Sequence, residues 1–183
     1  MGDVDDLETK LKIYMLITNR YKDLIAEKEE RSISEIRQKV SPYNDFIRQK
    51  KDSIVADFRP YEYGKHFFTA VQRALNYVRT IRNCEFLLTF WMSFEEMESL
   101  RAADVMDKCI LFAALLRALG SEDVKVHVTR AKRVFVGFNW SGIFYLVDVK
   151  NAAMLSGPEA DGIFLKDPLV YEFSDLVYES FEE

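Results

Sequence analysis

One helix constrains the fold of this chain more than any other stretch. It is expected to run from Asp104 to Gly120, and every residue from Ile110 to Leu116 is apolar. A surface helix carries a single apolar stripe, whereas a helix that is apolar almost all round is buried. At about 16 residues it is shorter than the roughly 20 residues that a bilayer requires. The sequence therefore predicts a central helix packed inside a globular core.

Both ends of this helix are marked in the sequence. Asp104 is a residue type that caps helix N-termini, and Asp107 places a second carboxylate in the first turn, where the helix dipole favours negative charge. Arg117 falls in the last turn, and Gly120 stands where a left-handed residue commonly ends a helix. We therefore expect a helix over residues 104–119.

The same stretch carries a family resemblance. The run D-x-x-D-K-x-I-L-x-A-x-L-L-R-A-L-G resembles the nucleophile helix of the transglutaminase-like superfamily, which is papain-like in fold. In that family a G-x-C-x-D pattern opens the helix and L-L-R-A-L-G closes it. The family glycine falls at Ala103, its cysteine at Val105 and its aspartate at Asp107. The resemblance covers about residues 63–150, and Phe90-Trp91 before the helix resembles the lead-in of archaeal-type members.

The resemblance implies chemistry by a cysteine, a histidine and an aspartate. A thiolate at a helix N-terminus is stabilised by the dipole and by a neighbouring imidazolium, and the carboxylate orients the ring. The family histidine opens a strand of the type H-x-W-V, which matches the stretch from Arg133 to Val136, and the family aspartate matches Asp148. Valine cannot attack and arginine stays protonated. We therefore expect a remnant site at Val105, Arg133 and Asp148 with no catalytic residue. In it Asp148 is expected to form a hydrogen-bonded pair with Arg133, or with His127, beside Val105.

An alternative interpretation is a rebuilt site, in which Cys109 acts with His127 and Asp148 as a cysteine amidase or protease. Cys109 lies one turn, about 5.4 Å, further along the helix. A cysteine in such apolar surroundings usually behaves as an inert small hydrophobe. His127 alternates with valines on its strand, so we expect it on a polar, partly exposed face. The sequence favours an inactive domain over this enzyme.

The hydrophobic period changes from about 3.6 to 2 after the central helix. Alternating apolar residues over 124–128, 133–138 and 143–149 predict three antiparallel strands joined by short turns. Residues 151–163 contain Gly and Pro and are predicted to form a loop, and residues 169–173 are predicted to form a further strand. The predicted fold class is α+β, a buried helix against an antiparallel sheet, as the papain/transglutaminase-like resemblance also implies.

The first 60 residues lie outside the resemblance. They predict an N-terminal helical region, 1–60, added to an α+β domain, 61–183. A long helix over residues 3–30 carries apolar residues at spacings of three and four: Val4, Leu7, Leu11, Tyr14, Tyr21 and Ile25. This face either packs on the chain's own domain or forms a homodimer contact. In the second case residues 3–58 act as a helical assembly module.

Charge and cysteine usage exclude several classes of function. A net charge of −5 argues against a nucleic-acid partner, because such partners usually select a basic surface. No signal-peptide pattern or membrane-length apolar run is present, and Cys84 and Cys109 form neither a metal pattern nor a disulfide framework. We expect a cytoplasmic protein with no membrane association, no metal and no cofactor. The predicted function is an inactive transglutaminase-like domain that binds a protein or peptide, or that is purely structural.

Overall fold

The computed structural model describes residues 2–86, 88 and 90–181, and of residues 2–6 the backbone alone. Contacts divide the chain into a smaller unit, Met1–Arg31 with Phe86–Trp91, and a larger unit, Ser32–Glu85 with Met92–Glu183. This division falls at a different place from the boundary expected at residue 60. The helices that follow Arg31 belong to the same unit as the central helix.

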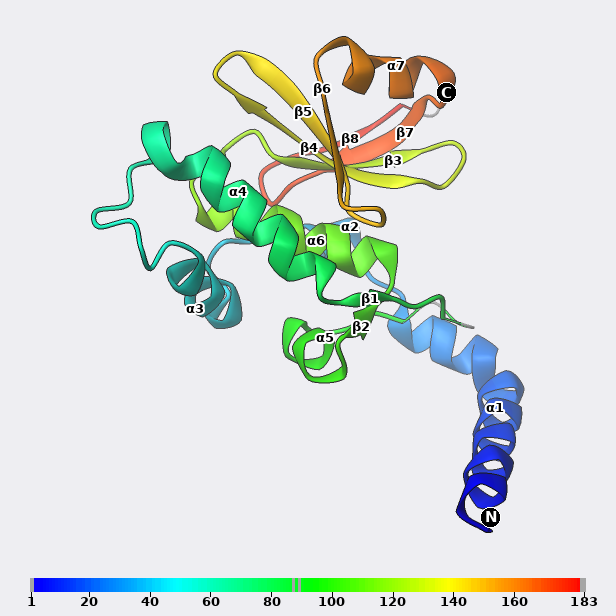
Figure 1. The fold of residues 1–183 in the computed structure, drawn as a ribbon. Coiled ribbons are helices and arrows are strands. Elements are labelled where there is room, and N and C mark those ends of the chain that lie inside the picture. Colours follow the sequence, from blue (N-terminus) through cyan, green and yellow to red (C-terminus); the bar gives the residue numbers. More distant parts are fainter. Residues whose placement is uncertain (1, 87, 89, 182–183) are drawn as a thin grey trace. The chain divides into compact units, whose positions relative to one another are not determined.

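The larger unit contains a six-stranded antiparallel sheet in the order β6-β5-β4-β3-β7-β8 (Figure 1). Its strands include all those predicted after the central helix, and they pair as neighbours in an antiparallel meander. The chain then returns so that β7 pairs with β3. The α+β class is therefore confirmed. The strands are β3 (Lys125–Thr129), β4 (Val134–Trp140), β5 (Ile143–Asp148), β6 (Ala153–Ser156), β7 (Leu169–Phe173) and β8 (Tyr178–Ser180).

Helices surround this sheet, and two short strands form a separate parallel pair. Capping boxes begin α2 at Ser32 and α5 at Ser93, because each serine exchanges hydrogen bonds with the glutamate three residues later. None of the described helices is long and apolar enough to cross a membrane. The elements are α1 (Gly2–Glu29), α2 (Ile33–Lys39), α3 (Asp45–Ile54), α4 (Tyr63–Arg79), β1 (Arg82–Asn83), α5 (Phe94–Leu100), β2 (Ala102–Ala103), α6 (Val105–Ala118) and α7 (Pro158–Lys166).

The predicted central helix is α6. The Asp104 side chain caps it by accepting a hydrogen bond from the Asp107 N–H at 2.7 Å, and Gly120 follows it with a φ of 103°. Every residue from 107 to 116 is buried. Helices α3 and α4 pack on α6, as do strands β3 and β4 (Figure 1). Burial on all sides explains why the helix is apolar around its whole circumference.

The loop predicted over residues 151–163 is wrong, because this segment forms β6 and most of α7. Proline at the first helical position suits a helix, since its missing N–H has no partner there in any case. Helix α7 covers the face of the sheet opposite α6 (Figure 1). There it packs Ile163 and Phe164 against Phe135 and Leu146. Helices therefore pack on both faces of the central strands, whereas the edge strand β8 stays exposed.

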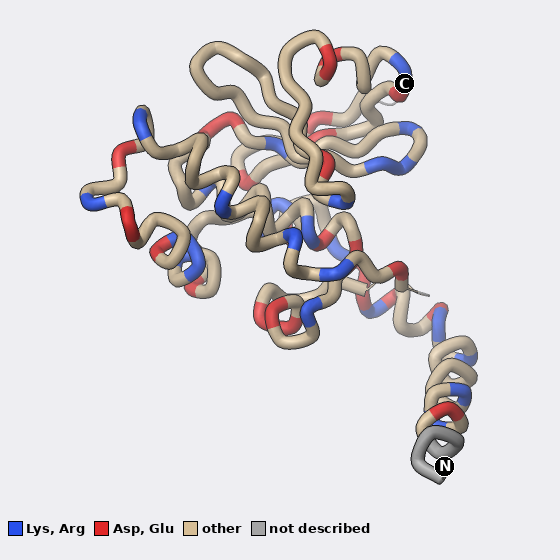
Figure 2. The backbone as a smooth tube through the Cα atoms, in the orientation of Figure 1, with Lys and Arg blue, Asp and Glu red and all other residues tan. Residues whose placement is uncertain are grey.

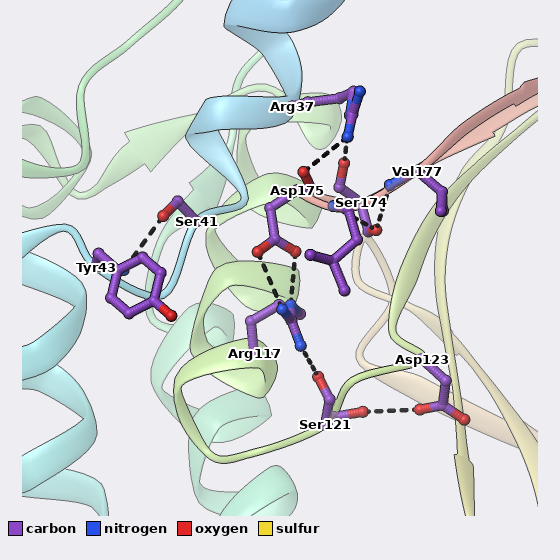
Figure 3. Close-up of polar contacts among 10 residues, drawn as sticks. Arg37, Ser41, Tyr43, Arg117, Ser121, Asp123, Ser174, Asp175 and Val177 are labelled. Atoms are coloured by element: carbon purple, nitrogen blue, oxygen red, sulfur yellow. Dashed lines mark hydrogen bonds and ion pairs between the residues drawn. The ribbon is translucent and has the colours of Figure 1, made fainter.

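An ion pair joins the C-terminal turn of α6 to the β7–β8 turn. The Arg117 guanidinium donates to both carboxylate oxygens of Asp175, at 2.6 and 3.0 Å, and to the Ser121 carbonyl (Figure 3). Arg37 of α2 donates to the carbonyls of Ser174 and Asp175 from the other side (Figure 3). Arg117, in the last turn of α6 as expected, makes a largely buried two-pronged contact.

Leu115→Ala tests the burial of α6. Leu115 is fully buried, so truncation removes packed atoms and leaves a cavity, and the free energy of unfolding should fall by about 2–5 kcal/mol. Leu165→Ala in α7 is the matched control, because Leu165 is 85% exposed and its truncation should change little. Urea denaturation of both variants measures the difference. Equal effects at the two positions would contradict the packing described for α6.

Candidate functional site

The three predicted remnant positions lie on neighbouring elements of the larger unit. Val105 is the first residue of α6 and is half-buried. Arg133 directly precedes β4, and Asp148 is the last residue of β5, which pairs with β4. The Arg133 side chain lies over the ring of Phe135, which packs under α7, so it is directed away from α6.

The hydrogen-bonded pair predicted between Asp148 and either Arg133 or His127 is wrong. Asp148 accepts hydrogen bonds from the backbone N–H and the side-chain amide of Asn151, at 3.1 and 2.7 Å. No basic side chain of the described residues forms an ion pair with it. The strand register explains this result, since Val136 stands opposite Val147 and Arg133 lies beyond the end of the paired stretch.

Asp167, which the sequence did not single out, is the partner of Arg133. Its carboxylate accepts hydrogen bonds from the Thr129 hydroxyl at 2.6 Å, the Ala131 N–H at 2.9 Å and the Arg133 Nε at 2.8 Å. These donors, with Thr129 first, hold the pKa of Asp167 below its usual range. Arg133 therefore ties the β3–β4 turn to the end of α7. No local pattern around Asp167 distinguishes it in the sequence.

The expectation that His127 lies on a partly exposed polar face is wrong. Its side chain is 7% exposed and packs against Phe144 and Phe164 under α7, a helix that the sequence did not predict. Its Nδ1 lies 2.9 Å from the Glu172 carboxylate on β7, although the two groups are not aligned as a hydrogen bond. Contact with His127, and then with Lys125, lowers the pKa of Glu172.

The alternative triad is not assembled. Cys109 is fully buried, and its Sγ contacts the Val134 carbonyl at 3.7 Å. Burial raises the pKa of this thiol, and the nearby Asp148 carboxylate raises it further. His127 lies on the opposite face of the sheet, under α7. Among the described residues, no hydrogen bond or ion pair joins Cys109 to Asp148 or to His127, and burial holds the thiol in its unreactive form.

Two buried charged residues occupy the first turns of α6. The Asp107 carboxylate accepts a hydrogen bond from the Met92 N–H at 3.1 Å, and burial, with the neighbouring Asp104 charge, raises the pKa of Asp107 to about 7. The Lys108 ammonium donates at 2.8 Å to the Ile81 carbonyl and to the Asn83 side chain. In the sequence, both residues are charged and stand just before an apolar run. We interpreted Asp107 only as a carboxylate favoured by the helix dipole, and did not predict that either residue would be buried.

The lysine also belongs to a longer polar connection. Asn83, which accepts from Lys108, donates from its amide to the Lys150 carbonyl at 3.0 Å, just past the end of β5. Desolvation lowers the pKa of Lys108. The N-terminal end of α6 is therefore linked through Asn83 to the β5–β6 turn beside Asp148. This contact is structural, because each polar group already has a backbone or amide partner.

A cavity of about 310 Å³ adjoins the same end of α6. Lys39 donates to the Met92 carbonyl at 3.0 Å while the N–H of Met92 donates to Asp107, so the cavity wall is fixed to the helix. Among the described residues, no group of three or more His, Cys, Asp or Glu side chains is placed to hold a metal ion. The cavity is lined by Glu35, Gln38, Lys39, Asn44, Met92, Ser93, Phe94 and Glu95.

Comparisons with models of known protein families, with curated proteins and with solved structures find no match for this chain.

Asp107→Asn tests the buried carboxylate. Because the pKa of Asp107 is about 7 when folded and near 4 when unfolded, the folded state binds more protons between those values. Its ionisation therefore makes the free energy of unfolding fall as pH rises from about 4 to 7. An asparagine keeps the acceptor for Met92 without the charge. The variant should be more stable than the parent above pH 7, by about 2–4 kcal/mol.

Urea denaturation between pH 4 and pH 8 measures this effect. The gain should shrink as the pH falls toward 4, where the parent carboxyl is protonated in both states. Asp52→Asn is the control, because Asp52 is exposed and should show no comparable pH dependence. A gain that is equal at both ends of the pH range would contradict a raised pKa at Asp107.

Proposed function

We propose that the larger unit is a catalytically inactive, transglutaminase-like domain that binds a protein or peptide, or that acts as a structural module. The observation that carries the proposal is the start of α6. At the position where the resemblance expects a thiol, the first helical residue is Val105, on a buried helix beside antiparallel strands. A valine at this position has neither a proton to lose nor a lone pair to donate.

The surrounding groups also support an inactive site. Arg133, in the family's histidine position, is bound to Asp167, and Asp148 is bound to Asn151. Both groups are therefore engaged in local structure, and an arginine cannot exchange a proton at physiological pH. Cys109, the alternative nucleophile, is fully buried. These contacts support a structural use of the three positions in place of catalysis.

The cavity beside α6 supports a binding role. Its volume of about 310 Å³ lies at the small end of the range for ligand sites, and it suits one or two peptide side chains better than a large cofactor. Its walls combine an aromatic ring at Phe94 with charged groups of both signs, at Lys39 and Glu95. Such a lining suits a mixed polar and apolar segment of a partner protein.

Restoring the family's side chains tests the assignment. In a Cys84→Ser background, Val105→Cys puts a thiol at the N-terminus of α6, where the dipole should lower its pKa below about 8.5. Adding Arg133→His should lower the thiol pKa by about one further unit only if the new imidazole turns from the α7 side of the sheet toward the thiol, as the resemblance implies. The rate of alkylation by iodoacetamide against pH measures both effects, and Cys109 should contribute little because it is buried.

Lys132→His, combined with the same Val105→Cys change, is the matched control for the histidine. Residue 132 is the exposed neighbour of Arg133 in the same turn, so its imidazole should not act on the thiol. A pH profile that is unaffected by Arg133→His, or affected equally by both histidines, would remove the support for a transglutaminase-like remnant.

Peptide-library panning distinguishes a binding role from a purely structural one. Val105→Glu should abolish capture of peptides selected by the parent chain, because a carboxylate would occupy the rim of the remnant site. Glutamate is favourable in the first turn of a helix, so the fold should persist, and thermal denaturation checks this. Leu165→Glu, at an exposed position on α7, should leave capture unchanged. Failure to select any peptide with the parent chain would favour the structural role.

A further inference from the structure

Helix α1 carries large apolar side chains that its own unit leaves exposed. With 28 residues it is about 42 Å long, whereas the other part of the unit is the short segment Phe86–Trp91. The exposed fractions of these side chains lie between 43% and 69%. Exposed apolar surface on this scale marks an interaction site. The side chains are Leu7, Leu11, Ile13, Tyr14, Met15, Leu16, Ile17, Tyr21 and Leu24.

Most of these residues follow the spacing of a coiled coil. One stripe alternates steps of four and three residues, and Ile17 and Leu24 extend it on one side. A repeat of seven residues in two turns keeps such a stripe facing a partner helix along its whole length. In Figure 2, charged residues are spaced along α1 between uncharged ones. The stripe consists of Leu7, Leu11, Tyr14, Thr18, Tyr21 and Ile25.

We propose that this stripe is the contact surface for a second copy of α1, packed antiparallel as a two-stranded coiled coil. Six apolar side chains on and beside the stripe each expose roughly 100 Å², so the two copies together bring about 1,200 Å² to the contact. These side chains are Leu7, Leu11, Tyr14, Ile17, Tyr21 and Leu24. That area reaches the range of specific protein–protein interfaces. In a two-fold symmetric contact the same surface of each copy faces the other copy. One stripe on each chain is therefore sufficient to form the dimer.

The order of residues in the stripe selects the antiparallel direction. In an antiparallel pair Leu11 lies opposite the partner's Tyr21, and Tyr14 lies opposite the partner's Thr18, so each large ring meets a smaller side chain. Glu8, which forms an exposed ion pair with Lys12 on its own helix, comes beside the partner's Lys22. A parallel pair would instead place the two copies of Lys28 side by side on the seam, where like charges repel.

Sedimentation equilibrium of the full chain tests the contact. Leu11→Glu places a charge on the seam of each copy and should raise the dimer dissociation constant about 100-fold or more. Leu16→Glu is the matched control, because the two leucines are 57% and 60% exposed but lie about 140° apart around the helix. It should leave the dissociation constant within about threefold. Circular dichroism verifies that both variants keep the fold.

Disulfide formation tests the direction, in a Cys84→Ser background that removes the exposed thiol. In the antiparallel pair the two copies of Met15 flank the two-fold axis, so Met15→Cys should cross-link under mild oxidation. Thr18→Cys should cross-link only in a parallel pair, where position 18 meets itself. Cross-linking through Thr18→Cys and not through Met15→Cys would overturn the antiparallel arrangement.

Two further results would overturn the proposal altogether. The first is a parent chain that stays monomeric up to about 100 µM, because a specific interface of this size should have a dissociation constant below that concentration. The second is a monomer that binds vesicles of mixed neutral and anionic lipids through α1, since an amphipathic helix with basic residues can also lie on a membrane surface. Loss of vesicle binding in Leu11→Glu would then assign the stripe to lipid.

Discussion

Burial of α6 on all sides is the constraint on which the larger unit depends. A helix apolar around its circumference needs partners in every direction, and here strands β3 and β4 contact it, as do helices α3 and α4. Such a layered arrangement of helices on one face of an antiparallel sheet is one of the few that bury both kinds of element. The second face of the sheet then needs its own cover, which α7 supplies.

The same burial removes the polar groups at both ends of α6 from water, so they need hydrogen-bond partners within the protein. The first N–H groups and last C=O groups of a helix lack partners within the helix, and charged side chains near them lose contact with water. At the N-terminal end, Asp104 caps the helix, Asp107 holds Met92, and Lys108 holds Asn83. At the C-terminal end, Arg117 binds Asp175. Each buried charge is therefore also a link to a neighbouring segment.

The central helix and the meander could be predicted because their signals are local. The cap at Asp104, the glycine at Gly120 and the alternation over 124–149 each depend on a few adjacent residues. The environment of His127 could not be predicted in this way, since its burial depends on α7, which lies 31 or more residues further along the chain. The Gly-Pro pair that begins α7 is as typical of a turn as of a helix start, and we interpreted it as a turn.

The predicted pairing of Asp148 with Arg133 was wrong for a related reason. Arg133 directly precedes β4 and Asp148 ends β5, close to the strand ends expected from the alternation, but an arginine side chain is long enough to reach several carboxylates. Asp167 offers it a site with two further donors, Thr129 and Ala131, already in place, and a charge-assisted contact of this kind is stronger than a neutral one. The sequence separates Asp167 from Arg133 by 34 residues, so only the return of the chain into β7 brings them together.

Helices α1 and α6 illustrate two different placements of apolar residues on a helix. In α6 the apolar residues surround the axis and the charges are confined to the ends, which suits a helix enclosed by its own unit. In α1 the apolar stripe runs beside charges along the whole length, and the main segment that its unit supplies besides the helix is the short stretch Phe86–Trp91. A helix isolated in water gains little from its backbone alone, since most helical stability comes from packing an apolar face. An apolar stripe on α1 that is left exposed therefore contributes little to the stability of this helix, which is why we propose a second copy as its partner.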